Sequence, residues 1–425
     1  MTPVLPQHHK PPAPSPPPST TWINGLRGIA SLIIALNHYL YPDFETPWLG
    51  YGSSPSNQHL HQLPLLRLPF SGHGARPLFF VISAYCASFR PIRLRDSRGL
   101  AHMAASLSAS AFRRPLRLYL PLLFMAAVSQ LLLYCGAYAG PALYAATGLR
   151  PWAGAAAHLA FLLRYAVDIC NPLAALPVNP GLNLQYWVIP LELGGSLACY
   201  VTVLALARVA PRVRLAVLAG AVVAPFVWRG SCFTWAFLAG VWVAEVDWLE
   251  ERGGLCVRRG VRRAVFALGV WLVCLPDNYR ETPGYAWCAW VEDVVMRAWG
   301  VEAPHNWRSV GAVAVVFGVS GERALQRVFD MRVPQAVARV SWEVYLVHVL
   351  VYNVLKEPVR RGVARLLGKM GAVAPENGFL WTEYLISGAF IAVAVWWSAR
   401  RLKMVNARLV AFTKWLEMAA QDTIL

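Results

Sequence analysis

Charged side chains are scarce in this sequence of 425 residues, of which 14% are charged and 57% are hydrophobic. The length alone would suggest two or three soluble domains, but this composition fits a membrane protein better, because the apolar residues are too many for one soluble core. The apolar residues instead cluster into windows near bilayer length, separated by basic or Pro- and Gly-rich stretches. The sequence therefore predicts a membrane protein, with the lipid bilayer as its solvent.

Acidic residues are fewer than basic ones, with 22 Asp and Glu against 39 Lys and Arg and a formal net charge of +17. Such an excess can bind nucleic acid when it gathers on one soluble face. Here the Lys and Arg stand in short runs between apolar segments, as the positive-inside rule describes. We therefore expect no nucleic-acid partner.

Paired cysteines are also missing. The eight cysteines are dispersed, mostly in apolar windows, and no Cys-x-x-Cys pair occurs. No histidines stand at metal-ligand spacing either. We expect neither a metal site nor a permanently bound cofactor, and we interpret the cysteines as small hydrophobic residues.

An apolar run is missing from the first twenty residues, which hold many prolines. They can form neither a helix nor the core of a signal peptide. We expect a disordered tail over 1–20, a transmembrane domain over 21–400 and a basic cytosolic C-terminal tail over 401–425.

Ten apolar segments predict an all-α fold, a polytopic bundle of about ten transmembrane helices. They lie near residues 22–41, 77–90, 115–135, 187–207, 214–228, 232–248, 264–275, 308–320, 336–355 and 380–399. Basic groups in every second loop place both termini on the cytosolic side. Two segments fit less well. Residues 356–379 are basic although the predicted topology places them on the outer side, and they indicate an amphipathic interfacial helix. The apolar stretch 153–167 is the other: if it crosses the membrane, the predicted orientation of every later segment is reversed.

The first apolar segment contains Arg27 and His38, and ionisable groups at such depth are costly and usually functional. Eleven residues at about 100° each give roughly 1100°, about 20° beyond three turns. Both side chains therefore project from one helix face, about 16 Å apart along the axis. The alternative is that Arg27 snorkels to the interface and His38 forms a helix–helix hydrogen bond.

Three arginines open the third segment: Arg113, Arg114 and Arg117. Guanidinium groups bind phosphate bidentately and stay charged at any working pH. They predict a cytosolic pocket for the phosphates of a nucleotide-like donor. The alternative is ordinary positive-inside flanking.

Glu192 lies near the outer end of the fourth segment, at a depth similar to that of His38. A carboxylate beside an imidazole can orient it and raise its basicity. The alternative is a pair that only neutralises a buried charge, for example with Arg164 or Arg229.

His348 lies in a late helix with Tyr345 three residues earlier on the same face. Such a lone histidine is more often a packing residue than a catalyst.

Together these motifs resemble the membrane-bound acyltransferase 3 family, over residues 22 to about 399. The family's arginine, ten residues and histidine are similar to Arg27 and His38, and its FFVISGY pattern to FFVISAY at 79–85. Further similar positions are Arg114, Arg117, Tyr119 and Pro121, then Trp187 and Glu192, then Ser341 to His348. The chain departs from the pattern at Asn24, often Asp, and at Ala84, usually Gly.

The resemblance implies transfer of an acetyl or short acyl group from acyl-CoA, a co-substrate, to a hydroxyl of a small molecule such as a secondary metabolite, a sugar or a lipid. His38, Glu192 and Arg27 would be catalytic, with His38 either a general base or the site of a covalent acyl-histidine. Arg113, Arg114 and Arg117 would bind the coenzyme, and His348 and Tyr345 are further candidates. A multi-pass protein of the endoplasmic reticulum membrane is expected in a eukaryote. The rival class is a transporter with Arg, His and Glu in its pathway.

Overall fold

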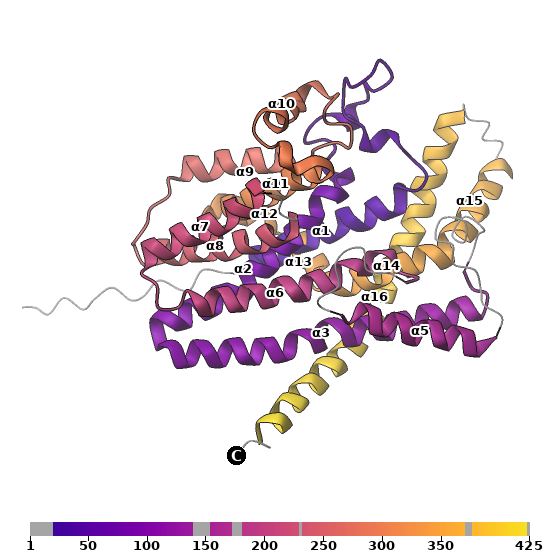
Figure 1. Cartoon of the computed structure of the whole chain (residues 1–425). Helices are drawn as coiled ribbons and strands as arrows, with labels where there is room; N and C mark the ends of the chain where they lie inside the picture. The colour runs from indigo at the N-terminus through magenta and orange to yellow at the C-terminus, as the bar shows by residue number, and fades with distance from the viewer. Residues whose placement is uncertain (1–19, 139–153, 172–180, 229–231, 370–375, 423–425) are drawn as a thin grey trace, which may run out of the picture.

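The computed structural model describes residues 20–138, 154–171, 181–228, 232–369 and 376–422 (Figure 1). Within these ranges the regular secondary structure is helical and no β-strand occurs, so the all-α prediction is confirmed. The predicted N-terminal tail, apart from its last residue, lies outside the described residues, as do the last three residues of the chain.

Helices account for every one of the ten predicted segments. Their bounds are α1 Thr21–Leu40, α2 Gly72–Arg98, α3 Leu100–Tyr134, α5 Ala155–Ile169, α6 Val188–Ala205, α7 Pro211–Trp228, α8 Cys232–Glu251, α9 Arg259–Val273, α10 Ala286–Val294, α11 Ala303–Ser320, α12 Arg323–Asp330, α13 Arg332–Ala338, α14 Ser341–Val351, α15 Glu357–Lys369 and α16 Glu376–Asp422. A π-helical turn, Tyr352–Lys356, joins α14 to α15. Short 3₁₀ turns fill the connections, among them η4, Leu184–Trp187.

Three helical stretches of the described chain are long and apolar enough to cross a bilayer: Leu100–Tyr134, Leu184–Ala205 and Trp381–Ala419. They indicate a membrane protein. The predicted count of about ten spans is not confirmed, because other helices are shorter or more polar. Helix α9, for example, has 15 residues, about 22 Å against a hydrocarbon core of about 30 Å.

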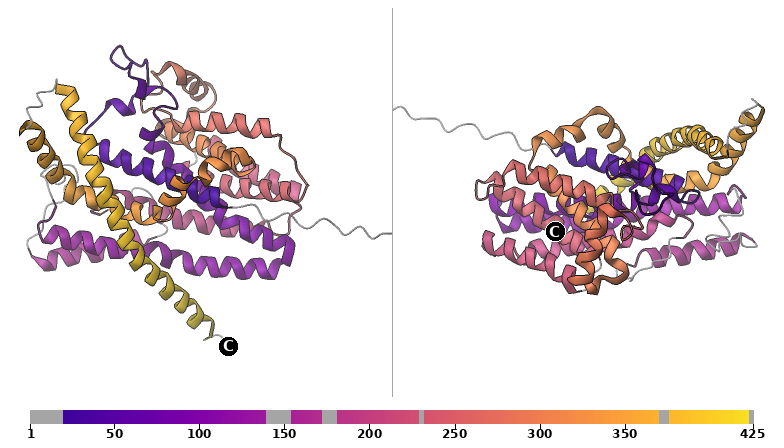
Figure 2. Two further views of the ribbon diagram at one scale, coloured as in Figure 1. Left: turned by 180° about the vertical axis from the view of Figure 1, so that it is seen from behind. Right: turned by 90° about the horizontal axis from the view of Figure 1, so that it is seen from above.

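Two helices extend well beyond their predicted bounds. Helix α3 starts at Leu100 rather than near 115, because the stretch 100–111 is rich in the good helix formers Ala, Leu and Met. Helix α16 continues for 47 residues, so the segment predicted as a tail from 401 is helical to Asp422. Its C-terminal end extends past α3 (Figures 1 and 2).

The two segments that fitted the topology less well both form helices. The apolar stretch 153–167 becomes α5, which packs against α3. The basic stretch becomes α15, and acidic partners neutralise part of its charge. Lys356 contacts Asp43, and Arg360 Nε lies 2.9 Å from Glu383 Oε1. These ion pairs offset part of the positive charge of this segment.

Helix α1 contacts α2, α12, α13 and α14. Two of its glycines allow this close approach. A Cβ at Gly25 would lie 1.9 Å from the carbonyl oxygen of Phe329, and one at Gly28 would lie 2.7 Å from that of Pro334. Because of this packing, the face of α1 that carries His38 meets α14.

Candidate active site

His38 and His348 form a direct pair between α1 and α14. His38 Nδ1 lies 2.8 Å from His348 Nε2, and the two rings stack with centroids 5.1 Å apart. His348 is buried, with 1% of its surface exposed, whereas His38 is partly exposed. The two histidines singled out in the sequence therefore meet, although 310 positions separate them.

A chain of hydrogen bonds fixes which ring nitrogen of each neutral histidine carries the proton. His348 Nδ1 lies 3.0 Å from the carbonyl oxygen of Val344, which can only accept, so this nitrogen donates. His348 Nε2 then has a lone pair and accepts from Nδ1–H of His38. The lone pair of His38 is left on Nε2, where it can take a proton or attack a carbonyl carbon.

Glu192 does not pair with His38, as the similar depths of the two side chains had suggested. Its carboxylate accepts hydrogen bonds from Arg114 on α3 and from Ser83 on α2. Arg114 also donates to Ser83. Depth along a helix does not give the rotation about its axis, and α6 turns Glu192 toward α2 and α3. The role of orienting His38 belongs to His348 in this geometry.

Three arginines carry more positive charge than their surroundings neutralise. Arg27 donates only to the uncharged Asn24, at 3.4 Å, and its buried Nε has no hydrogen-bond partner. Arg114 pairs with Glu192, but its own Nε is also buried without a partner. Arg117 is exposed and forms no ion pair or hydrogen bond with any residue that the structure describes. Among the described residues, only one of these three guanidinium groups is paired with a carboxylate, an arrangement suited to an anion.

Arg113 stands apart from this group. Its Nη1 lies 2.7 and 2.8 Å from the two carboxylate oxygens of Glu417 on α16. This ion pair joins α3 to the C-terminal part of α16. Of the three arginines predicted to bind the coenzyme, Arg114 and Arg117 lie beside Arg27, whereas Arg113 is already neutralised.

Two tyrosines hold α14 in place around His348. The Tyr345 hydroxyl donates to the backbone carbonyl of Gln185, and its ring centroid lies 6.2 Å from that of His348. The Tyr352 hydroxyl donates to the carbonyl of Ala35 on α1 at 2.9 Å. Tyr352 was not predicted from the sequence, although its position four residues after His348 puts it on the same helix face, and the two ring centroids lie 5.6 Å apart.

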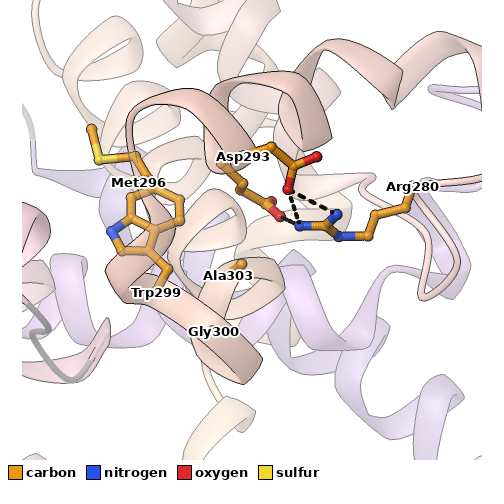
Figure 3. Close-up of a pocket in the computed structure, with 7 residues that line it drawn as sticks. Arg280, Asp293, Met296, Trp299, Gly300 and Ala303 are labelled. Atoms are coloured by element: carbon orange, nitrogen blue, oxygen red, sulfur yellow. Dashed lines mark hydrogen bonds and ion pairs between the residues drawn. The ribbon is translucent and has the colours of Figure 1, made fainter.

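A separate pocket of about 380 Å³ lies between α10 and the turn that precedes α11 (Figure 3). Arg280, Asp293, Met296 and Trp299 are among its lining residues. Its buried Glu292 already accepts hydrogen bonds from Tyr279, Arg280 and Trp307. None of the candidate residues lines this pocket, and both carboxylate oxygens of Glu292 are occupied by hydrogen bonds that join these turns.

Comparison with known proteins decides the family. A family model described as an acyltransferase domain, that of the acyltransferase 3 family, matches residues 20–401. The chain belongs to this family. The match spans every candidate residue from Arg27 to His348, and it confirms the resemblance read from the motifs.

Curated fungal relatives of this acyltransferase include three similar proteins. The O-acetyltransferase PaAT-1 of Phomopsis amygdali is 26% identical over 428 residues, 89% of this chain and 79% of the relative. Acyltransferase R4 of a Phoma species is 28% identical, and acyltransferase clz18 of Cochliobolus lunatus is 26% identical, each over 80% of this chain and 84% of the relative. No solved structure matches the acyltransferase at a significant level.

Proposed function

We propose that this acyltransferase moves an acetyl or other short acyl group from acyl-CoA to a hydroxyl group of a small molecule. One observation carries the proposal. A single helix, α1, presents a histidine with a free Nε2 lone pair near one end and an incompletely neutralised arginine near the other. The two side chains lie about 16 Å apart along the axis, a separation that an extended pantetheine arm can bridge.

The surplus positive charge is the proposed site for the coenzyme phosphates. Arg27, Arg114 and Arg117 would hold these groups through bidentate, charge-assisted hydrogen bonds. Glu192 and Ser83 would act on the coenzyme only through Arg114, by fixing the direction of its guanidinium group. The thioester would then point toward His38.

His38 is the proposed chemical centre. Its Nε2 can accept the proton of the acceptor hydroxyl, or it can attack the thioester carbonyl and carry the acyl group itself. In either case His348 accepts the Nδ1 proton and holds the ring in the reactive tautomer. A neutral imidazole with a fixed tautomer is suited to both roles.

The acyl group and the acceptor are proposed from the relatives. PaAT-1 is named an O-acetyltransferase, while R4 and clz18 are named acyltransferases. We extend the acetyl group and the oxygen acceptor to this chain, with a secondary metabolite as the first acceptor to test and a sugar or a lipid as the next ones.

The proposed location is the endoplasmic reticulum membrane of a fungal cell. The three apolar helices support insertion in a bilayer, and the fungal relatives support a eukaryotic host. We further propose a multi-pass arrangement with both termini in the cytosol, because the arginine-rich segments fall in alternate connections.

Coenzyme binding tests the proposal without knowledge of the acceptor. Membranes that carry the wild-type protein should bind radiolabelled coenzyme A, and Arg117→Ala should weaken binding about 10- to 100-fold, the usual effect of losing hydrogen bonds to a charged group. Arg212→Ala is the matched control, since Arg212 is an exposed arginine at the start of α7. Equal binding by wild type and Arg117→Ala, or no binding by wild type, would contradict the proposal.

A further inference from the structure

A second histidine with a carboxylate partner lies at the outer end of α2. His73 Nδ1 lies 3.1 Å from Asp277 Oδ1, in the segment that follows α9. Asp277 Oδ1 also accepts from Arg308 Nη2 at 2.6 Å. Arg308 is only 3% exposed at its side chain and is held in turn by the carbonyl oxygen of Leu275. The histidine is thus fixed by a carboxylate that is itself fixed by a buried arginine.

The protonation of this pair follows from its neighbours. Burial raises the pKa of the Asp277 carboxyl, but the hydrogen bond from His73 and the positive charge of Arg308 outweigh burial and hold that pKa below its usual range. Asp277 is therefore a carboxylate that can only accept, and Nδ1 of His73 donates to it. The lone pair of neutral His73 lies on Nε2, which bonds no residue that the structure describes.

His73 lies beside the outer end of α1, where His38 is located. The helices touch there, because a Cβ at Gly72 would be 2.4 Å from the Cβ of Asn37. The ring of Tyr41, one turn after His38, has its centroid 5.5 Å from that of His73. His73 is partly exposed, with 27% of its side chain accessible, so a second substrate can reach it.

The reaction needs a second base if His38 carries the acyl group, because an acylated Nε2 cannot take a proton. His348 cannot serve, since its Nε2 binds His38 and its Nδ1 binds Val344. Resting on the proposed function, we propose that the two histidines divide the reaction: His38 is the acyl-carrying nucleophile, and His73, oriented by Asp277, is the general base that activates the acceptor hydroxyl.

The two steps balance as follows. His38 Nε2 attacks the thioester carbonyl carbon, the carbon–sulfur bond breaks, and coenzyme A leaves as a thiolate from an acyl-imidazolium. In the second step the hydroxyl oxygen attacks the acyl carbon while His73 Nε2 takes the hydroxyl proton. The carbon–nitrogen bond breaks and His38 recovers its lone pair. His73 then releases its proton to water, and this proton balances the thiolate of coenzyme A formed in the first step. Asp277 stabilises the positive charge that His73 carries in between.

The two half-reactions can be measured separately in membranes that contain the full chain. Exchange of labelled coenzyme A into unlabelled acetyl-CoA reports the first step. Loss of a labelled acetyl group from the protein to glycerol or water reports the second step. His73→Gln and Asp277→Asn are the test variants. His59→Gln is the matched control, because His59 is an exposed histidine of the outer connection.

We expect His73→Gln to keep exchange near the wild-type rate and to slow loss of the acetyl group about 10²-fold or more. Labelled acetyl should then accumulate on the protein, in a form that hydroxylamine removes and that His38→Ala does not form. Asp277→Asn should give the same signature more weakly, and His59→Gln should behave as wild type. A merely structural role for His73 would not produce trapped acetyl-protein.

Other outcomes overturn the inference. If His73→Gln matches wild type in both steps, or loses both steps together, His73 is not the second base. If wild type transfers acetyl groups but shows no exchange, no acyl-histidine forms and the inference fails while the proposed function stands. If wild type neither exchanges nor transfers, the proposed function itself fails.

Discussion

At His38 the important question is which ring nitrogen holds the proton. The carbonyl of Val344 fixes the tautomer of His348, and His348 fixes that of His38. In serine hydrolases a carboxylate plays this orienting part. Here the neutral imidazole of His348 orients His38. Among the described residues no carboxylate contacts His38, and Glu192 accepts a hydrogen bond from Arg114 instead.

The first prediction concerns His348. His348→Ala removes the acceptor for the Nδ1 proton of His38, so the ring loses its fixed tautomer, and we expect the acyl-transfer rate to fall about 10²-fold or more. His102→Gln is the control, because His102 is exposed on α3 and bonds only the carbonyl of Arg98. The rate at which each variant transfers the labelled acetyl group from acetyl-CoA is the measurement. A wild-type rate in His348→Ala would show that the pair is only a packing contact.

The second prediction concerns pH and Asp277, whose pKa is lower in the folded protein than in the unfolded chain. The ionised carboxylate of Asp277 therefore adds its full share to the free energy of unfolding above the pKa of the unfolded chain, about 3.9. This share is lost as the pH falls toward the lower pKa of the folded protein. Thermal unfolding in detergent should show a constant difference between wild type and Asp277→Asn from pH 7 to about 5. The difference should shrink below about pH 4. A difference that already shrinks near pH 6 would contradict this account.

At the scale of helices, the close contact between α2 and α8 depends on a glycine. Ala84 of α2 is fully buried and faces Gly240 of α8. A Cβ at Gly240 would lie 2.6 Å from the Cβ of Ala84 and 2.6 Å from the carbonyl oxygen of Val81. The missing side chain at Gly240 makes room for that of Ala84.

The third prediction follows from this contact. Gly240→Ala should lower stability by about 1–3 kcal/mol, because backbone and side chain must both move. Gly220→Ala on α7 is the matched control, since a Cβ at that position would meet no atom within 4 Å. That substitution should be neutral or stabilising by up to about 1 kcal/mol. Thermal unfolding of both variants in detergent gives the comparison, and equal melting temperatures would contradict the packing argument.

Helix positions were predictable from sequence, whereas helix partners were not. Apolar runs with basic flanks located α1 and α6 closely, because burial and bilayer length act on consecutive residues. The contact of His38 with His348 depends on how α1 packs on α14, which no local pattern encodes. The same limit explains why Glu192 was assigned to His38 rather than to Arg114. The pairing of His73 with Asp277 was not predicted, because the two residues lie 204 positions apart and no local sequence pattern links them.

At the scale of the whole molecule, the distribution of charge sets the proposed topology. The surplus arginines near α1 and α3 would face the cytosol, where acyl-CoA is available, and the His38 end of α1 would face the other side. We predict that a C-terminal tag on sealed microsomes is digested by added protease. A tag inserted in the exposed turn at 55–56 should be protected until detergent is added. Protection of the C-terminal tag would overturn the orientation.

The most direct test of the central claim is acetyl transfer from radiolabelled acetyl-CoA by membranes that contain wild type or His38→Ala, with an extract of the host as the acceptor source. The account predicts a labelled ester product with wild type and its loss with His38→Ala at an equal level of protein. Equal product from both would contradict the assignment of His38 as the chemical centre of this acyltransferase.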